Sequence, residues 1–161
     1  MKEDNRVAGG RAELEAQVAA HPFLIGMSEH HIRLLAECAM HSHFRAGQVI
    51  FREGESANRF YLIEHGKVAV ESSTLGEPVR IEEIGDGDLL GWSWLFPPYA
   101  WHFSARALKD TTAIFFYGTI LRNYCEKDNS FGLELFKRMS IVMLRRLQAA
   151  RQKLLNVHQT R

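Results

Sequence analysis

The sequence predicts a mainly β domain with helices on both sides of it, and three observations support this. The middle of the chain holds short segments that are rich in β-branched and aromatic residues and are separated by glycine or proline. Their turn signals recur about every 8 to 12 residues, a spacing typical of a β-sandwich or barrel. The segments before and after them repeat their apolar residues with a helical period. The 161 residues, 46% hydrophobic and 24% charged, are typical of one globular domain with its own core.

Two helices are expected before the β segments. The first covers the apolar stripe of residues 11–20 and ends at His21, because Pro22 disfavours helix in the residue before it. Ser28 is a typical N-cap residue and opens a second helix. The apolar face of that second helix comprises Ile32, Leu35, Ala36 and Ala39.

The predicted strands follow in the middle of the chain. They lie within residues 43–55, 58–72, 77–85, 102–109 and 112–118. Val68 and Val70 alternate with Lys67, Ala69 and Glu71, the pattern of a half-buried strand. Glycines stand at the joints between the segments, where turns often need a positive φ.

Helix returns at the end of the chain, in a short segment over residues 118–127 and a long one over residues 129–158. Two lines of side chains spaced by seven form a seam over three heptads, which predicts that the long helix pairs with a second copy. The seam comprises Leu133, Phe136, Ser140, Met143, Leu147, Ala150, Leu154 and Val157. A second apolar face, made of Leu135, Met139 and Val142, is expected to lie on the β domain. The alternative is a helix that packs only within its own chain.

Composition argues against several classes of partner. The net charge is +1, so neither nucleic acid nor an anionic membrane is predicted as the main partner. No apolar run reaches the ~18 residues of a membrane span. The polar start has no signal segment, so we expect a cytoplasmic protein whose residues 1–10 form a disordered tail. Cys38 and Cys125 are expected to be reduced, buried thiols. The basic residues of the last helix are interpreted as its solvated face: Lys137, Arg138, Arg145, Arg146, Arg151, Lys153 and Arg161.

No catalytic motif is found in the sequence, so the chain is not predicted to be an enzyme. His41 and His43 would point the same way on a strand, and His30 and His31 are adjacent. No carboxylate or cysteine close to the His41–His43 pair in the sequence completes a chelating set. We therefore expect exposed or hydrogen-bonded histidines, with no metal and no cofactor.

The segment AGQVIFREGESANRFYLIEHGKVAV, residues 46–70, resembles the cyclic-nucleotide-binding domain of the catabolite activator type. The positions that carry the resemblance are Gly47, Ile50, Gly54, Glu55, Phe60, Tyr61, Ile63, Gly66 and Val68. IEEIGDGDLLGWSWLF, residues 81–96, is similar to the segment that leads into the phosphate-binding cassette of the family. The resemblance spans roughly residues 20–160. It implies a double-stranded β-helix, or jelly-roll barrel, with N-terminal helices and a long C-terminal helix.

The same resemblance implies where a ligand would bind. In the family, a glycine and the N–H groups of a short helix hold the cyclic phosphate, an arginine pairs with its charge, and a glutamate accepts a hydrogen bond from the ribose. Here Gly91 stands at the glycine, but Trp92 stands at the glutamate, Trp101 at the arginine and His102 at the serine or threonine that follows. Arg106 is the next arginine and would have to reach back. Ordinary cyclic AMP binding is therefore not expected.

Three interpretations of this aromatic loop stay open. Its side chains fill the former pocket as a closed core, or they line a pocket for a cyclic nucleotide or another aromatic molecule, with His102 or Arg106 as the polar anchor. In the third interpretation they protrude as a docking patch for a protein. The candidate binding residues are Gly91, Trp92, Ser93, Trp94, Trp101, His102, Phe103, Ser104 and Arg106.

The sequence thus predicts a non-catalytic regulatory module, with the β domain and its N-terminal helices over residues 11–128 and a dimerisation helix over residues 129–161. It is expected to be a homodimer that acts through an aromatic pocket or a protein partner, without a DNA-binding domain of its own. One alternative is a cyclic AMP or cyclic GMP regulator with atypical anchors. Another is a transcription regulator of the catabolite activator family that acts without its own winged helix.

Overall fold

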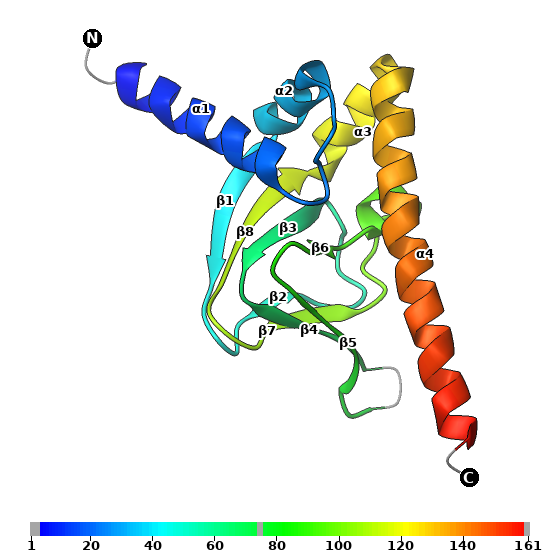
Figure 1. Ribbon diagram of the computed structural model, residues 1–161. Coiled ribbons are helices and arrows are strands. Elements are labelled where there is room, and N and C mark those ends of the chain that lie inside the picture. The colour runs from blue at the N-terminus through cyan, green and yellow to red at the C-terminus, as the bar shows by residue number, and fades with distance from the viewer. Residues whose placement is uncertain (1–3, 74–75, 160–161) are drawn as a thin grey trace.

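The computed structural model of the protein describes residues 4–73 and 76–159 (Figure 1). The helices are α1 (Asp4–Ala20), α2 (Glu29–Glu37), α3 (Gly118–Lys127) and α4 (Asn129–Gln159), together with the 3-10 helix η1 (Ser93–Leu95). The strands are β1 (Ala39–Phe44), β2 (Val49–Phe51), β3 (Arg59–His65), β4 (Lys67–Ser72), β5 (Val79–Gly85), β6 (Leu89–Leu90), β7 (Ser104–Ala107) and β8 (Thr111–Tyr117). This order confirms the mainly β domain with flanking helices.

The strands form two antiparallel sheets that enclose the interior of a jelly roll (Figure 1). One sheet has the order β1-β8-β3-β6 and the other the order β2-β7-β4-β5. Strands β6 and β7 follow each other in the sequence but belong to opposite sheets. The segment between them, residues 91–103, therefore crosses from one sheet to the other.

Two cores lie on the two faces of the β1-β8-β3-β6 sheet. Because successive side chains of a strand point to opposite faces, β3 sends Phe60 and Leu62 toward the helices and Tyr61 and Ile63 into the barrel. All four side chains are buried, which explains why β3 reads as a continuous apolar run. The outer core joins this sheet to α2, α3 and the first half of α4, and the inner core fills the space between the sheets.

The N-terminal segments follow the prediction with two differences. Ser28 caps α2 as expected, and its hydroxyl accepts a hydrogen bond from the amide of His31 at 3.3 Å. Ala39, predicted on the helix, instead opens β1, because α2 ends at Glu37. Of the expected tail, residues 1–3 lie outside the described residues, and residues 4–10 form the first turns of α1.

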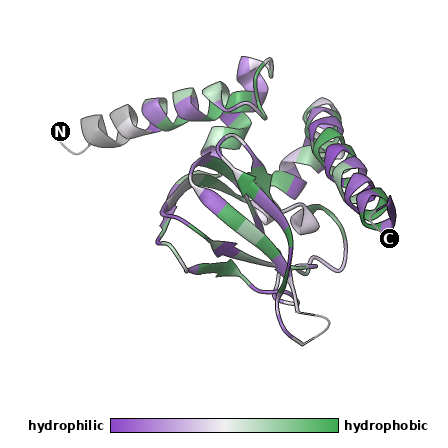
Figure 2. Ribbon diagram, turned by 60° about the horizontal axis from the view of Figure 1, so that its bottom comes forward, coloured by the Kyte–Doolittle hydropathy of each residue, from purple (hydrophilic) through white to green (hydrophobic). Residues whose placement is uncertain are grey.

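Helix α4 has one face on the domain and one face in solvent. The predicted inner face is confirmed, since Leu135 and Met139 are buried in the outer core and Val142 packs against it. Figures 1 and 2 show that the helix continues past the β sheets and carries hydrophobic residues to its far end. The large hydrophobic side chains exposed on α4 are Leu133, Phe136, Ile141, Leu144, Leu147, Leu154, Leu155 and Val157. No helix within the described ranges is long and apolar enough to cross a membrane.

The basic residues of α4 are not all solvated, which corrects the prediction. The guanidinium of Arg138 donates to the backbone oxygens of Phe23 and Ile25, at 2.9 and 3.0 Å. Lys153 reaches the backbone oxygen of Ile81 at 3.3 Å. Arginine can bury its aliphatic stem while its guanidinium meets backbone oxygens, so a charged residue on a helix is not by itself a sign of exposure.

His21 connects the α1–α2 turn to the barrel. Its side chain is buried, and the amide of Phe23 donates to Nδ1 at 3.2 Å. Since Nδ1 is an acceptor, the proton lies on Nε2, which donates to the backbone oxygen of Ile63 at 3.0 Å. Burial lowers the pKa of His21, and the hydrogen bond to Ile63 opposes that effect more weakly. The turn is therefore fixed by a neutral imidazole.

This arrangement predicts a pH-dependent stability. Below about pH 6.5 the unfolded chain takes up a proton that folded His21 resists, so the free energy of unfolding should fall as the pH drops from about 6.5. The slope from one proton cannot exceed about 1.4 kcal/mol per pH unit. The free energy of unfolding is measured by urea unfolding at several pH values between 7.5 and 5, a range of about 2.5 units around the histidine pKa. Its decrease with falling pH should be smaller in His21→Gln than in the wild type. His43→Gln, at an exposed position of β1, is the matched control and should keep the wild-type slope.

Candidate functional site

The crossing segment between β6 and β7 forms the candidate site. It begins at Gly91, which has a φ of 92°, a backbone conformation that side-chain-bearing residues rarely adopt. η1 follows directly, and an extended stretch then leads into β7. This is the layout that the resemblance predicts for a phosphate-binding cassette, and the positions of its side chains decide what it can bind.

Trp101 lies inside the barrel. Its ring stacks on Phe51, with centroids 3.7 Å apart and an interplanar angle of 7°, and only 4% of the residue is exposed. Two backbone hydrogen bonds hold it, from its amide to the oxygen of Glu55 at 2.9 Å and from the amide of Gly54 to its oxygen at 2.8 Å. A Cβ at Gly91 would lie 2.7 Å from the Trp101 ring. Gly91 therefore leaves space for the indole as well as allowing the turn.

The other two tryptophans of the loop point elsewhere. Trp94 is fully buried in the outer core, where its ring stacks on Phe60 at 5.2 Å between centroids. Trp92 is half-buried, and its ring meets Phe103 edge to face at 5.4 Å. Trp92 packs at the edge of the same outer core that buries Trp94, and among the three tryptophans only Trp101 enters the inner core.

Ser93 and His102 hold the loop closed across its base. The Ser93 hydroxyl is buried and lies 2.9 Å from Nδ1 of His102, whose ring is exposed. Ser104 accepts a hydrogen bond from the amide of Glu53 at 2.9 Å. These predicted site residues are brought together, but they bond to one another and to the neighbouring turn.

Arg106 faces away from the barrel interior. Its neighbours on β7, Ala105 and Ala107, point inward and are fully buried. The guanidinium of Arg106 lies 3.5 Å from the carboxylate of Glu71 and donates to the backbone oxygen of Gly47 at 3.2 Å. In this arrangement the side chain contacts Glu71 and Gly47 and does not reach back toward the position of the missing arginine.

The docking-patch interpretation finds no support in the exposure of the aromatics. Trp94 and Trp101 are buried, and Trp92, Tyr99 and Phe103 are half-buried. The Tyr99 ring is also covered by the guanidinium of Arg122, 4.1 Å from its centroid. These rings of the loop are therefore packed within the domain and do not project from it.

Arg59 is a residue that the sequence analysis missed. It opens β3 on the barrel-facing side, and its guanidinium carbon lies 4.5 Å from the ring centroid of Phe115 and 5.4 Å from that of Tyr117. Its Nε is buried without a hydrogen-bond partner. A guanidinium that lies over aromatic rings and has an unsatisfied N–H donor is suited to binding an anion. The alternation of side chains along β3 was the available signal.

Arg146 was misread as a solvated residue and instead joins α4 to the loop. Its guanidinium lies 5.1 Å from the ring centroid of Trp92, 3.3 Å from the carboxylate of Glu82, and bonds to the backbone oxygen of Leu89. Burial lowers its pKa, and the charge of Glu82 opposes that effect. A groove of about 460 Å³ lies beside it, between α4 and the β5–β6 turn and outside the barrel.

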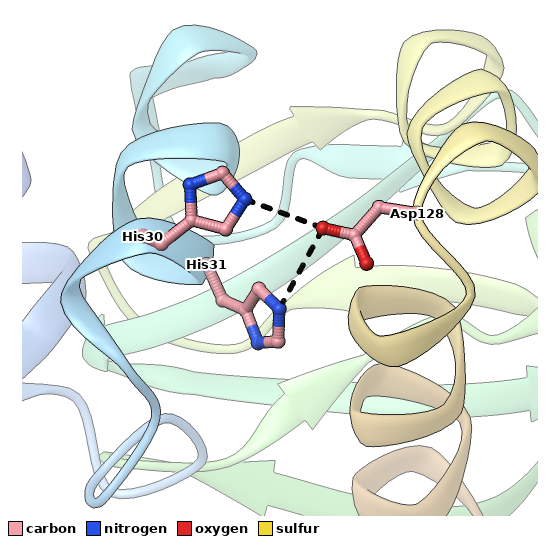
Figure 3. A group of neighbouring side chains, drawn as sticks. All are labelled: His30, His31 and Asp128. Carbon is pink, nitrogen blue, oxygen red and sulfur yellow. Dashed lines mark hydrogen bonds and ion pairs between the residues drawn. The ribbon is translucent and has the colours of Figure 1, made fainter.

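Other groups with chemical potential lie away from the loop. Cys38 is buried, and burial raises the pKa of its thiol to about 12, so it is no thiolate nucleophile at neutral pH. His41 and His43 are exposed on β1. Among the described residues, one group has the donors to hold a metal ion: His30 and His31 on α2 and Asp128 at the α3–α4 junction (Figure 3).

The paired sheets, the crossing segment with its glycine and short helix, and the flanking helices define a domain of the cyclic-nucleotide-binding fold. Residues 41–128 match the family described as the cyclic nucleotide-binding domain, and the chain belongs to this family.

Solved structures from several organisms share the fold. A putative cyclic nucleotide-binding protein from Geobacter metallireducens is 26% identical with a TM-score of 0.75, covering 83% of this chain and 97% of its own. The Thermus thermophilus catabolite activator protein is 22% identical with a TM-score of 0.66, covering 85% of this chain and 63% of its own. The regulatory subunit of a cAMP-independent protein kinase A from Trypanosoma brucei, as a mutant bound to cAMP, is 24% identical with a TM-score of 0.68, covering 83% of this chain and 48% of its own.

Among curated proteins, the lysophospholipase NTE1 of Phaeosphaeria nodorum is 29% identical over 133 residues. The match covers 77% of this chain but only 8% of that protein, so it concerns a small part of a much larger enzyme.

The packing of Trp101 predicts a large loss of stability on truncation. Trp101→Ala should lower the free energy of unfolding by about 3–5 kcal/mol, because it leaves a cavity against Phe51 and Gly91. Equilibrium urea unfolding followed by circular dichroism measures the change. Trp92→Ala, which removes a half-buried ring, is the control and should cost clearly less. Equal losses would contradict the assignment of Trp101 to the inner core.

Proposed function

We propose that the protein is a non-catalytic regulatory module of the cyclic-nucleotide-binding fold that does not bind cyclic AMP in the usual way of its family. The observation that carries the proposal is Trp101, which stacks on Phe51 inside the barrel at the position of the phosphate-pairing arginine. The module then regulates through its assembly and contacts with other chains, and its ligand pocket is closed by its own side chain.

The energetic argument has two parts. Losing a charge-assisted pair to a buried phosphate costs about 3 kcal/mol, which is more than a hundredfold in affinity. A nucleotide would also have to displace the Trp101 ring, which is 4% exposed and in stacking contact with Phe51. Both terms act against ordinary cyclic nucleotide binding.

The fold is compatible with such a departure. The Trypanosoma brucei protein named above is a regulatory subunit of a cAMP-independent kinase, and its cAMP-bound structure is that of a triple mutant. That name describes a protein of this fold as cAMP-independent, which is compatible with the proposal. It concerns that protein, and the experiment below asks the question of this chain.

A second candidate function is a cyclic nucleotide regulator with an atypical anchor. Arg59 favours it, because its guanidinium lies on the barrel side of β3 with a buried, unpartnered Nε. The backbone oxygen of Arg59 would lie 3.8 Å from a Cβ at Gly91, so this arginine stands next to the cassette glycine. Trp101 would have to move before a phosphate could reach it.

A ligand titration separates the two candidates. Protein freed of co-purified small molecules is titrated with cyclic AMP, cyclic GMP and a panel of aromatic acids, with the unfolding midpoint as the readout. A ligand at 100 times its dissociation constant adds about 2.7 kcal/mol, or several degrees. We expect no shift with either nucleotide in the wild type, and a shift in Trp92→Glu/Trp101→Arg, which restores the two lost side-chain types.

The Arg59→Met variant distinguishes the possible results of the nucleotide titration. A wild-type shift with cyclic AMP that disappears in Arg59→Met would replace the proposal with the second candidate. A wild-type shift that survives in Arg59→Met would refute both candidates. A shift with an aromatic acid alone would mean that the barrel opens for a different ligand. If the double variant shows no shift either, the wild-type titration alone decides between the two candidates.

We also propose that the module is a homodimer through α4. The heptad positions Leu147 and Leu154 are 67% and 64% exposed, although leucine at the same position of two successive heptads is typical of a buried contact. Leu133 and Phe136 continue the exposed seam toward the start of the helix. A second copy, which carries the same apolar line, would cover it on both chains.

Light scattering after size exclusion tests the dimer. The wild type should have about twice the 18.4 kDa mass of the chain, and Leu147→Glu/Leu154→Glu should have the mass of one chain. Gln148→Glu/Gln152→Glu adds the same charges off the seam and should stay dimeric. A wild-type monomer, or a dimer that survives the leucine substitutions, would contradict the assignment.

A further inference from the structure

Two adjacent histidines and one aspartate from distant parts of the chain converge at one point. His30 and His31 belong to the first turn of α2, and Asp128 lies between α3 and α4 (Figure 3). Their ligand atoms all lie within 4.8 Å of one another. Nε2 of His30 is 3.2 Å and Nε2 of His31 is 3.9 Å from the same oxygen, Oδ2 of Asp128.

The carboxylate of Asp128 is held in place by its other oxygen. Oδ1 accepts hydrogen bonds from the amide and the hydroxyl of Ser130, at 3.0 and 2.8 Å, and from the amide of Phe131 at 3.1 Å. These bonds cap α4 and leave Oδ2 turned toward the histidines. The amide of Phe131, the hydroxyl of Ser130 and the contact with His30 lower the pKa of Asp128 to about 2, so the group is an anion.

The histidines are arranged as one fixed and one adjustable ligand. The His31 side chain is 13% exposed, its ring meets Phe131 at 5.3 Å, and its Nε2 lies 3.2 Å from the Ser130 hydroxyl. The His30 side chain is 65% exposed and can change rotamer. Within the described part of the chain, Asp128 pairs with His30 and His31 and with no lysine or arginine.

These distances are close to those of a metal site. A tetrahedral zinc ion with bonds of about 2.0–2.2 Å needs ligand atoms about 3.3–3.5 Å apart. The His30–Asp128 separation of 3.2 Å is already suitable, and the remaining gap can be closed by rotation of the exposed His30 and a small shift of His31. Imidazole is a borderline ligand that calcium and magnesium seldom use, so two imidazoles with one carboxylate suit zinc and its neighbours in the first transition row better than those two ions.

We propose that His30, His31 and Asp128 bind a divalent transition-metal ion of the zinc type, with water completing the coordination. The ion would replace the two weak contacts to Oδ2 with three bonds and would join α2 to the point where α3 meets α4. The site lies on the helical side of the domain, outside the barrel, and does not depend on what the barrel binds.

The alternative is that the three groups are only a hydrogen-bonded ion pair. Metal titration of the full chain decides between the two. Protein stripped with a chelator and then freed of it is titrated with Zn²⁺ in competition with a chromophoric chelator. Co²⁺ replaces Zn²⁺ in a parallel series, because bound tetrahedral Co²⁺ has a visible absorption that the hydrated ion lacks.

The variants are chosen to keep the fold. His30→Gln changes an exposed residue, and Asp128→Asn keeps an oxygen at the N-cap of α4 and removes the charge. His41→Gln/His43→Gln removes the exposed pair on β1, the competing two-histidine set, and is the matched control. Circular dichroism of each variant confirms that it is folded.

The expected result is one ion per chain in the wild type and in the β1 variant, with affinity reduced at least about tenfold in His30→Gln and in Asp128→Asn. The visible Co²⁺ absorption should disappear in the same two variants. No binding by the wild type, wild-type affinity in both site variants, or loss of binding only in the β1 variant would each overturn the proposal.

Discussion

The stack of Trp101 on Phe51 inside the barrel is the constraint on which the rest of the site depends. An indole ring fits at this place only if the residue beside it has no side chain. Gly91 meets that condition, because a Cβ there would overlap the indole. A glycine that would serve phosphate contact in a ligand-binding cassette here serves the packing of a side chain. The backbone shape of the family is kept, and in this structure the space beside Gly91 is filled by the Trp101 ring.

The long helix is anchored to the same region through a buried cation. Arg146 contacts Trp92, Glu82 and Leu89 together, so the loop, β5, β6 and α4 meet at one guanidinium. A buried charge is costly unless it is paired and hydrogen-bonded, and Arg146 has both kinds of partner. Because these partners come from separate elements, the position of α4 depends on the conformation of the loop and the loop on α4.

Much of the fold could be predicted from the sequence, but the site only in part. Local patterns predicted most of the strands, Ser28 as a cap and the inner face of α4, but β6 and the greater part of β1 lie outside the segments predicted as strands. What failed depends on contacts distant in sequence, such as His30 with Asp128, 98 residues apart. The direction in which each tryptophan side chain points could not be predicted either, because an irregular loop lacks the regular side-chain repeat of a helix or strand. The position of Arg146 was an available signal, because it lies seven residues after Met139 on the stripe of α4 that faces its own domain. The charge of the residue alone led to the prediction that it is solvated.

The two faces of α4 explain how one helix can serve the fold and an assembly together. Phe131, Leu135 and Met139 are buried, and Arg146 extends the same stripe. From residue 147 onward every described residue is exposed, so the far end of the helix contributes little to the stability of its own domain. An isolated helix end in water is only marginally stable, and the apolar line there is not buried by the described part of the chain. Pairing with a second copy would give that line a partner, and it would use a surface that neither the barrel nor the outer core needs.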